Sequence, residues 1–122
     1  MADAQAVVAV MAERVRDSIS GSGRIEEQRM FGGIGFLLDG HFLCHASRKG
    51  LMVRVGRERE AKALAKPHAS LCRQGKRAMP GFIQVAPGGL QTTRDLNSWL
   101  KLGRDYLATL EPSSKSTPRR EQ

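Results

Sequence analysis

The 122-residue sequence is poor in cysteine and in aromatic residues, and it contains no long apolar run. Two cysteines are too few for a disulfide scaffold, and Cys44 and Cys72 are too far apart in sequence for a CxxC pair, so we expect free thiols. No stretch approaches the roughly 20 apolar residues that cross a bilayer, and the opening residues lack the pattern of a secretory signal. We therefore expect a cytoplasmic protein with no membrane contact.

The length and composition predict one globular domain. A chain of this size buries about two-thirds of its unfolded surface around a single core, and 40% of its residues are hydrophobic. We assign residues 1–110 to this domain. Residues 111–122 contain two prolines and several charges but no aliphatic or aromatic side chain, so we expect them to form a disordered polar tail.

The positive charge is concentrated in one segment. The formal net charge is +8, and residues 48–77 carry ten Lys or Arg against Glu58 and Glu60, which accounts for the whole excess. A basic segment of this kind favours an anionic partner, either a nucleic acid or an acidic protein surface. The candidate contact residues are the cations that we expect in turns and loops, namely Arg48, Lys49, Arg73, Lys76 and Arg77.

Apolar periodicity and turn signals predict an α+β fold. The predicted helices cover residues 4–20, 57–66 and 92–110. The predicted strands cover residues 24–31, 34–38, 41–46, 51–55 and 82–86, and residues 67–81 are expected to be irregular. Asp39-Gly40 is a strong signal for a two-residue hairpin, because both positions accept a positive φ. The order α-β-β-β-β-α-β-α predicts an antiparallel sheet of about five strands with the helices packed on one face.

Three motifs follow one another along the chain. They are Arg29-Met30-Phe31-Gly32-Gly33-Ile34-Gly35-Phe36 with the Asp39-Gly40 turn, Leu51-Met52-Val53-Arg54-Val55-Gly56, and Met79-Pro80-Gly81-Phe82-Ile83-Gln84-Val85. In this order they resemble the N-terminal domain of the TfoX/Sxy family. The residues that we treat as its structural motif are Met30, Phe31, Gly32, Gly33, Gly35, Asp39 and Gly40.

The resemblance implies a bacterial regulatory domain. The family is associated with natural competence, where its members work beside the cyclic-AMP receptor protein at competence promoters, and no catalytic residue carries over. Its N-terminal domain is similar to the secretion-chaperone-like α+β fold, which often occurs as a dimer, so the resemblance also implies a homodimer as one assembly. The full-length regulators add a C-terminal helical domain, and we expect this chain to act as a stand-alone N-terminal module.

Other groups of residues favour structural roles. Gly32-Gly33-Ile34-Gly35 is followed by a strand and a hairpin, whereas a phosphate-binding loop opens a helix, so we interpret these glycines as sites of bending and close strand packing. The potential metal ligands His41, Cys44, His45, His68 and Cys72 give no closed set, because neighbouring strand residues point to opposite sides. We expect no metal, no cofactor and no catalysis. Arg73, Lys76 and Arg77 would lower the pKa of Cys72 if its thiol were exposed.

These observations predict a non-catalytic regulatory or interaction module. We expect it to act through a protein partner, either an acidic surface or a part of the transcription machinery. The alternative is a direct, weak, salt-sensitive nucleic-acid-binding domain that uses residues 48–77. Base stacking has little support in the sequence, since we expect Phe42 and Phe82 to lie in the core.

Overall fold

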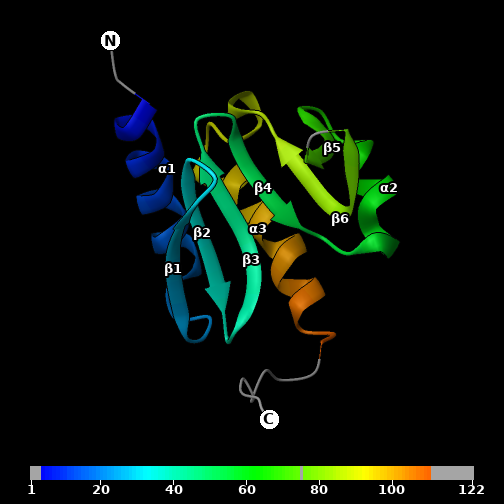
Figure 1. The fold of residues 1–122 in the computed structure, drawn as a ribbon. Helices are drawn as coiled ribbons and strands as arrows, with labels where there is room; N and C mark the ends of the chain where they lie inside the picture. Colours follow the sequence, from blue (N-terminus) through cyan, green and yellow to red (C-terminus); the bar gives the residue numbers. More distant parts are fainter. Residues whose placement is uncertain (1–3, 75, 111–122) are drawn as a thin grey trace.

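The computed structural model describes residues 4–74 and 76–110 (Figure 1). In chain order they form α1 (Ala4–Ile19), β1 (Ile25–Met30), β2 (Gly33–Leu38), β3 (His41–Ser47), β4 (Gly50–Arg54), α2 (Arg57–Leu64), β5 (Ala69–Gln74), β6 (Arg77–Val85), a 3-10 turn (Pro87–Gly89) and α3 (Thr93–Leu107). The predicted tail, residues 111–122, lies outside the described residues.

The strands form one antiparallel sheet in the order β1-β2-β3-β4-β6-β5. The α+β class is therefore confirmed, with β5 as a sixth strand. The prediction that residues 67–81 are irregular was wrong, because Ala69–Gln74 and the first half of β6 form a hairpin. β5 is an edge strand with exposed residues such as Ser70 and Arg73, so its sequence carries little of the apolar alternation that identifies half-buried strands.

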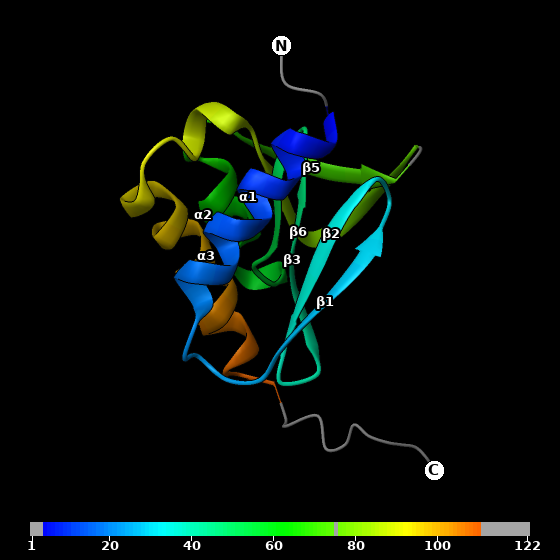
Figure 2. The same ribbon diagram turned by 90° about the vertical axis from the view of Figure 1, so that its left-hand side faces the viewer.

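All three helices cover the same face of the sheet (Figure 2). α1 packs on β2 and β3, α3 packs on β3 and β4, and α2 packs on β5 and β6. The opposite face carries no helix among the described residues, and we call it the open face. The predicted one-sided arrangement of helices is thus confirmed.

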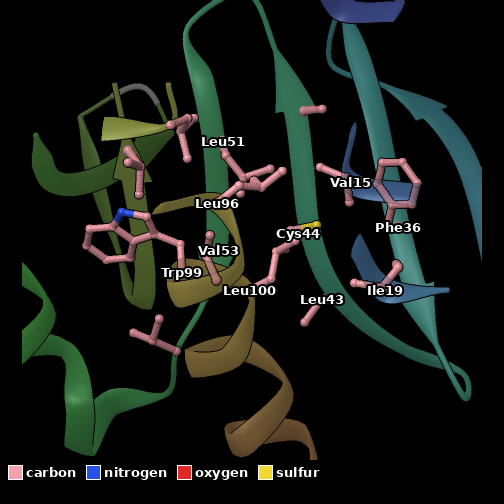
Figure 3. Close-up of a cluster of buried hydrophobic side chains, with 14 of the residues drawn as sticks. Val15, Ile19, Phe36, Leu43, Cys44, Leu51, Val53, Leu96, Trp99 and Leu100 are labelled. Atoms are coloured by element: carbon pink, nitrogen blue, oxygen red, sulfur yellow. The ribbon is translucent and has the colours of Figure 1, made fainter. Parts of the chain in front are cut away.

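The core lies between the helices and the sheet (Figure 3). Phe36, Cys44 and Val53 are register partners on β2, β3 and β4, and all three are fully buried. The helices contribute side chains at helical spacing: Val15 and Ile19 from α1, and Leu96, Trp99 and Leu100 from α3. The oxygen of the Thr92 side chain accepts a hydrogen bond from the Asp95 amide and so caps the N-terminus of α3.

Two tight hairpins shape the first half of the sheet. Asp39 and Gly40 join β2 to β3 with φ values of 51° and 87°, the conformation of a type I′ turn, as the sequence predicts. Phe31 and Gly32 join β1 to β2 with φ values of 48° and 75°. Both turns therefore have a positive φ at both central residues. Asp39-Gly40 is a residue pair that favours this conformation, whereas Phe31-Gly32 is not.

Candidate functional site

The open face combines apolar and basic side chains. Because side chains alternate along a strand, the residues between the buried core positions point to this side. The open face is defined by Met30, Phe31, Leu37, Phe42, His45, Met52, Arg54, Cys72, Phe82 and Gln84. Phe31 is 78% exposed and most of the others are half-buried. In Figure 2 the β1–β2 and β5–β6 hairpins both project on this side of the sheet.

The glycines of the first motif provide space on the open face. A Cβ on Gly35 would lie 2.7 Å from Cε of Met30, so the Met30 side chain lies directly over this glycine. A Cβ on Gly33 would lie 2.9 Å from Cε1 of His45 and would collide with the carbonyl oxygen of Ala46. Close strand packing therefore accounts for Gly33 and Gly35, whereas Gly32 is required by its positive φ.

His45 fixes the tip of the β1–β2 hairpin. It is buried, and its Nε2–H donates a hydrogen bond to the carbonyl oxygen of Met30 at 2.7 Å. The Phe31 ring stands edge-on to the imidazole, with 6.3 Å between ring centroids and 67° between planes. The hairpin tip is thus tied to β3 while the rest of the Phe31 ring faces solvent.

A second aromatic group occupies the other end of the open face. The Phe42 and Phe82 rings lie 6.0 Å apart, and both residues are half-buried. The prediction that they belong to the core was wrong. A register shift in the β2–β3 pair places Phe42 opposite Leu37, while both Leu43 and Cys44 are buried toward the helices. Nη1 of Arg54 donates to the Phe42 carbonyl oxygen at 3.4 Å, and its guanidinium carbon lies 5.3 Å from the Tyr106 ring centroid.

The five predicted contact cations are all exposed, but they form two groups. Arg48 and Lys49 occupy the β3–β4 turn, close to the end of β6. Arg73, Lys76 and Arg77 occupy the tip of the β5–β6 hairpin rather than the predicted loop, and Nη1 of Arg73 donates to the Lys76 carbonyl oxygen at 3.5 Å. The first group therefore lies near the end of the β5–β6 pair where β6 stops, and the second lies at its hairpin tip.

The two cysteines lie on different sides of the sheet, and burial raises the pKa of both thiols. Cys44 faces the core and its neighbour His45 faces the open side, so the two side chains diverge. Cys72 is buried, with its Sγ 3.0 Å from Sδ of Met52, and burial raises the pKa of its thiol even though Lys49 acts in the opposite direction. Arg73, Lys76 and Arg77 were expected to lower the pKa of an exposed Cys72 thiol. The thiol is buried instead, and its pKa is raised. Within residues 4–74 and 76–110, no three His, Cys, Asp or Glu side chains form a group that could hold a metal.

The third motif holds α2 against the sheet. The carbonyl oxygen of Gly81 accepts hydrogen bonds from the amides of Val55 and Gly56 at 2.8 Å and 3.0 Å, and the Gly81 amide donates to the Glu60 carboxylate. The φ of 86° at Gly81 makes this geometry accessible. Sequence reasoning missed Glu60, because its alternation with Arg57 and Arg59 is typical of a solvated helix face.

Among the helices formed by the described residues, none has the length and apolar composition needed to cross a membrane.

Comparison with known proteins identifies the family. The model of the TfoX N-terminal domain matches residues 17–106, which run from the end of α1 to the last turn of α3. No curated protein and no solved structure gave a match. The matched segment contains all three motifs and every residue that defines the open face. The chain therefore belongs to the TfoX N-terminal domain family.

Proposed function

We propose that this domain is a non-catalytic regulatory module that binds an acidic, partly apolar surface of a protein partner through its open face. The observation that carries the proposal is Phe31, a bulky side chain that is 78% exposed at the tip of the family motif. A positive φ is unfavourable for a residue of this size. An exposed aromatic residue held in a strained backbone is typical of a binding site.

The composition of the open face indicates the chemistry of the partner. Met30, Leu37 and Met52 give it an adaptable apolar centre between the two aromatic groups. Arg54 starts from an open-face position of β4, although its guanidinium lies over the Tyr106 ring of α3, and Lys49 lies close enough to influence the thiol of Cys72. Strand alternation places one acidic residue of β1, Glu26, on this side. Charge complementarity therefore favours an acidic partner.

The family supports a role in regulation. The full-length competence regulators of this family act beside the cyclic-AMP receptor protein. A component of the transcription machinery in the bacterial cytoplasm is therefore a suitable partner. A homodimer is the other assembly that the resemblance implies, and sedimentation of the purified protein distinguishes a dimer from a monomer.

The test compares a change at the tip of the β1–β2 hairpin with a change of the same kind on the outward side of α1, each replacing an exposed apolar side chain by Asn. Phe31→Asn removes the exposed ring and suits the type I′ turn, whereas Val10→Asn removes a side chain that is 59% exposed on α1. A partner captured from a lysate of the source cells is purified and titrated against each variant. We expect Phe31→Asn to weaken binding at least about tenfold, as loss of an interface anchor does, and Val10→Asn to leave it unchanged.

Two results would contradict the proposal. One is a partner that binds Phe31→Asn as tightly as the wild type. The other is the absence of any partner whose capture depends on the open face. Melting temperatures of both variants serve as the folding control, since Phe31→Asn is expected to melt at or slightly above the wild-type temperature.

Direct nucleic-acid binding is the second candidate. The observation that favours it is the β5–β6 hairpin, whose exposed Arg73, Lys76 and Arg77 lie on one projecting tip. Fluorescence anisotropy of labelled duplex DNA at two salt concentrations tests it, with all three cations changed to Glu. Binding that weakens steeply with salt and disappears in the triple variant supports phosphate contacts. No binding at low salt excludes them.

A further inference from the structure

The sheet ends in two edge strands that differ in their capacity to pair with another chain. The strand order places β1 at one margin and β5 at the other (Figure 1). β5 has an irregular register between Leu71 and Arg73, and the charged residues at its hairpin tip are all basic. β1 pairs with β2 over six residues without a shift. Irregular backbone and charges of one sign protect an edge strand from further pairing, so β5 is protected and β1 is not.

The outward side of β1 presents backbone groups that can form a further ladder. The Asp39 amide donates a hydrogen bond to the Arg24 carbonyl oxygen, which sets the alternation of backbone hydrogen bonds along β1 and β2. Ile25, Glu27 and Arg29 therefore direct their amide and carbonyl groups away from β2. Among the described residues, no strand pairs with this side of β1. It is a template for one more antiparallel strand.

The side chains of β1 are self-complementary in one register. The exposed residues of the strand are Glu26, Glu27, Gln28 and Arg29. A two-fold axis perpendicular to the sheet would pair β1 with β1 of a second copy of the chain. An axis at Gln28 places Glu27 of each copy opposite Arg29 of the other. An axis at Glu26, Glu27 or Arg29 instead places two like charges directly opposite each other, which is destabilising.

Glu27 can form this pair and keep its contact within the chain. Its carboxylate accepts hydrogen bonds from Arg16 of α1 and has further lone pairs for a second guanidinium. Among the described residues, Arg29 takes part in no ion pair. Pairing at β1 therefore supplies a carboxylate to a cation that has none within its own chain.

We infer that two copies of the chain associate through β1, with Gln28 facing Gln28 at the two-fold axis. Each of the two Glu27–Arg29 pairs exchanges its backbone hydrogen bonds and brings opposite charges together. The two sheets become one continuous sheet, and both open faces lie on the same side of it. Only this last consequence bears on the proposed function, because the pairing itself needs no other protein.

Sedimentation equilibrium at about 0.15 M salt tests the charge pairing. Glu27→Lys and Arg29→Glu each place like charges opposite each other, so we expect either variant alone to raise the dimer dissociation constant at least about tenfold. An equimolar mixture of the two variants restores opposite charges in both pairs, so we expect it to associate within about threefold of the wild type. Glu58→Lys and Arg48→Glu are matched controls, since they make the same charge changes at exposed positions outside β1. Melting curves establish that all variants are folded.

Cysteine cross-linking tests the register. Residues at position 28 of the two copies face each other with Cα atoms about 4.5 Å apart, a spacing that a disulfide accepts. Residues at position 26 lie more than about 13 Å apart, because four residues along the strand separate them. We expect Gln28→Cys to form a covalent dimer under mild oxidation and Glu26→Cys to remain a single chain. The native Cys44 and Cys72 are buried, so the wild type is the control for their contribution.

Four results would overturn the inference. The first is a wild type that stays monomeric at concentrations up to about 1 mM. The second is a mixture of Glu27→Lys and Arg29→Glu that associates no better than either variant alone. The third is an equal loss of association in the two control variants, which indicates an effect of net charge. The fourth is equal cross-linking of Glu26→Cys and Gln28→Cys. None of these measurements involves the partner proposed above, so their failure is distinguishable from failure of the proposed function.

Discussion

At the scale of single residues, the two type I′ turns have the same backbone conformation but different residues at the first central position. Asp39-Gly40 has the sequence that this turn favours, and its carboxylate also accepts a hydrogen bond from the Arg24 amide at 2.9 Å. Phe31-Gly32 adopts the same backbone with a bulky first residue, at a cost of about 1 kcal/mol. The ring of Phe31 gains little burial in return, which is why we relate it to binding rather than to folding.

The two adjacent glycines of the motif are predicted to differ in their tolerance of a side chain. Gly33→Ala places a Cβ against the Ala46 carbonyl oxygen, so we expect it to lower the free energy of unfolding by about 2–3 kcal/mol. A Cβ on Gly32 would meet no atom within 4 Å, and Asn tolerates a positive φ, so we expect Gly32→Asn to lower the free energy of unfolding by less than about 1 kcal/mol. Urea denaturation measures both. Equal losses of unfolding free energy in the two variants would show that backbone conformation, and not close packing, explains why both positions are glycine.

The thiols are predicted to react slowly. Burial raises the pKa of Cys72, and it raises that of Cys44 much further. Reaction with a thiol reagent in native buffer should therefore be slower than for a free cysteine, with Cys72 modified before Cys44 and both modified quickly in urea. Rapid native labelling of Cys72 would contradict its buried position. Because both folded-state pKa values are raised, the stability that the neutral thiols contribute is expected to fall as the pH rises above about 9.

At the scale of elements, one ion pair connects the first helix to the edge strand. The Arg16 guanidinium forms a two-pronged contact with the Glu27 carboxylate, which joins α1 to β1. Hydrogen bonding to Arg16 lowers the pKa of Glu27. Both side chains are partly exposed, so solvent screening keeps their contribution to stability below about 1 kcal/mol.

This ion pair predicts a small acid-sensitive contribution to stability. A carboxyl with a lowered folded-state pKa stabilises the protein above its ordinary value near 4.5, and the contribution disappears as the pH falls through the lowered value. The difference in unfolding free energy between wild type and Arg16→Gln should therefore be present at pH 7 and decrease as the pH falls below about 4.5. A difference that persists unchanged at pH 3 would assign the effect to packing of the Arg16 stem.

At the scale of the whole molecule, stability depends on the single layer between helices and sheet. Leu100 is buried at the centre of this layer, so Leu100→Ala is expected to lower the free energy of unfolding by about 3 kcal/mol. Val10→Ser changes an exposed side chain and should alter it by less than about 0.5 kcal/mol. Thermal unfolding followed by Trp99 fluorescence and by circular dichroism measures both effects. Transitions that do not coincide would show that the helices and the sheet unfold separately.

Much of the fold was predictable because its signals are local. The helical stripe of Leu96, Trp99 and Leu100 and the Asp39-Gly40 turn depend on neighbouring residues alone. β5 was not predictable, since an edge strand gains its stability from backbone pairing with β6 rather than from an apolar pattern. The prediction that Phe42 lies in the core was wrong because a register shift between β2 and β3 turns its side chain to the open face. Such a shift depends on how two strands pair and is not visible in either strand alone.

The class of fold, the family and the location of the basic residues along the chain all follow from the amino-acid sequence alone. Periodicity, turn chemistry and motif order are properties of local stretches, so they can be read without knowing which segments meet. The tertiary structure decided which of these residues act together. It separated the five predicted cations into two groups and exposed Phe31 at the tip of the β1–β2 hairpin. Surfaces form from long-range packing, and the pattern of a single segment does not contain that information.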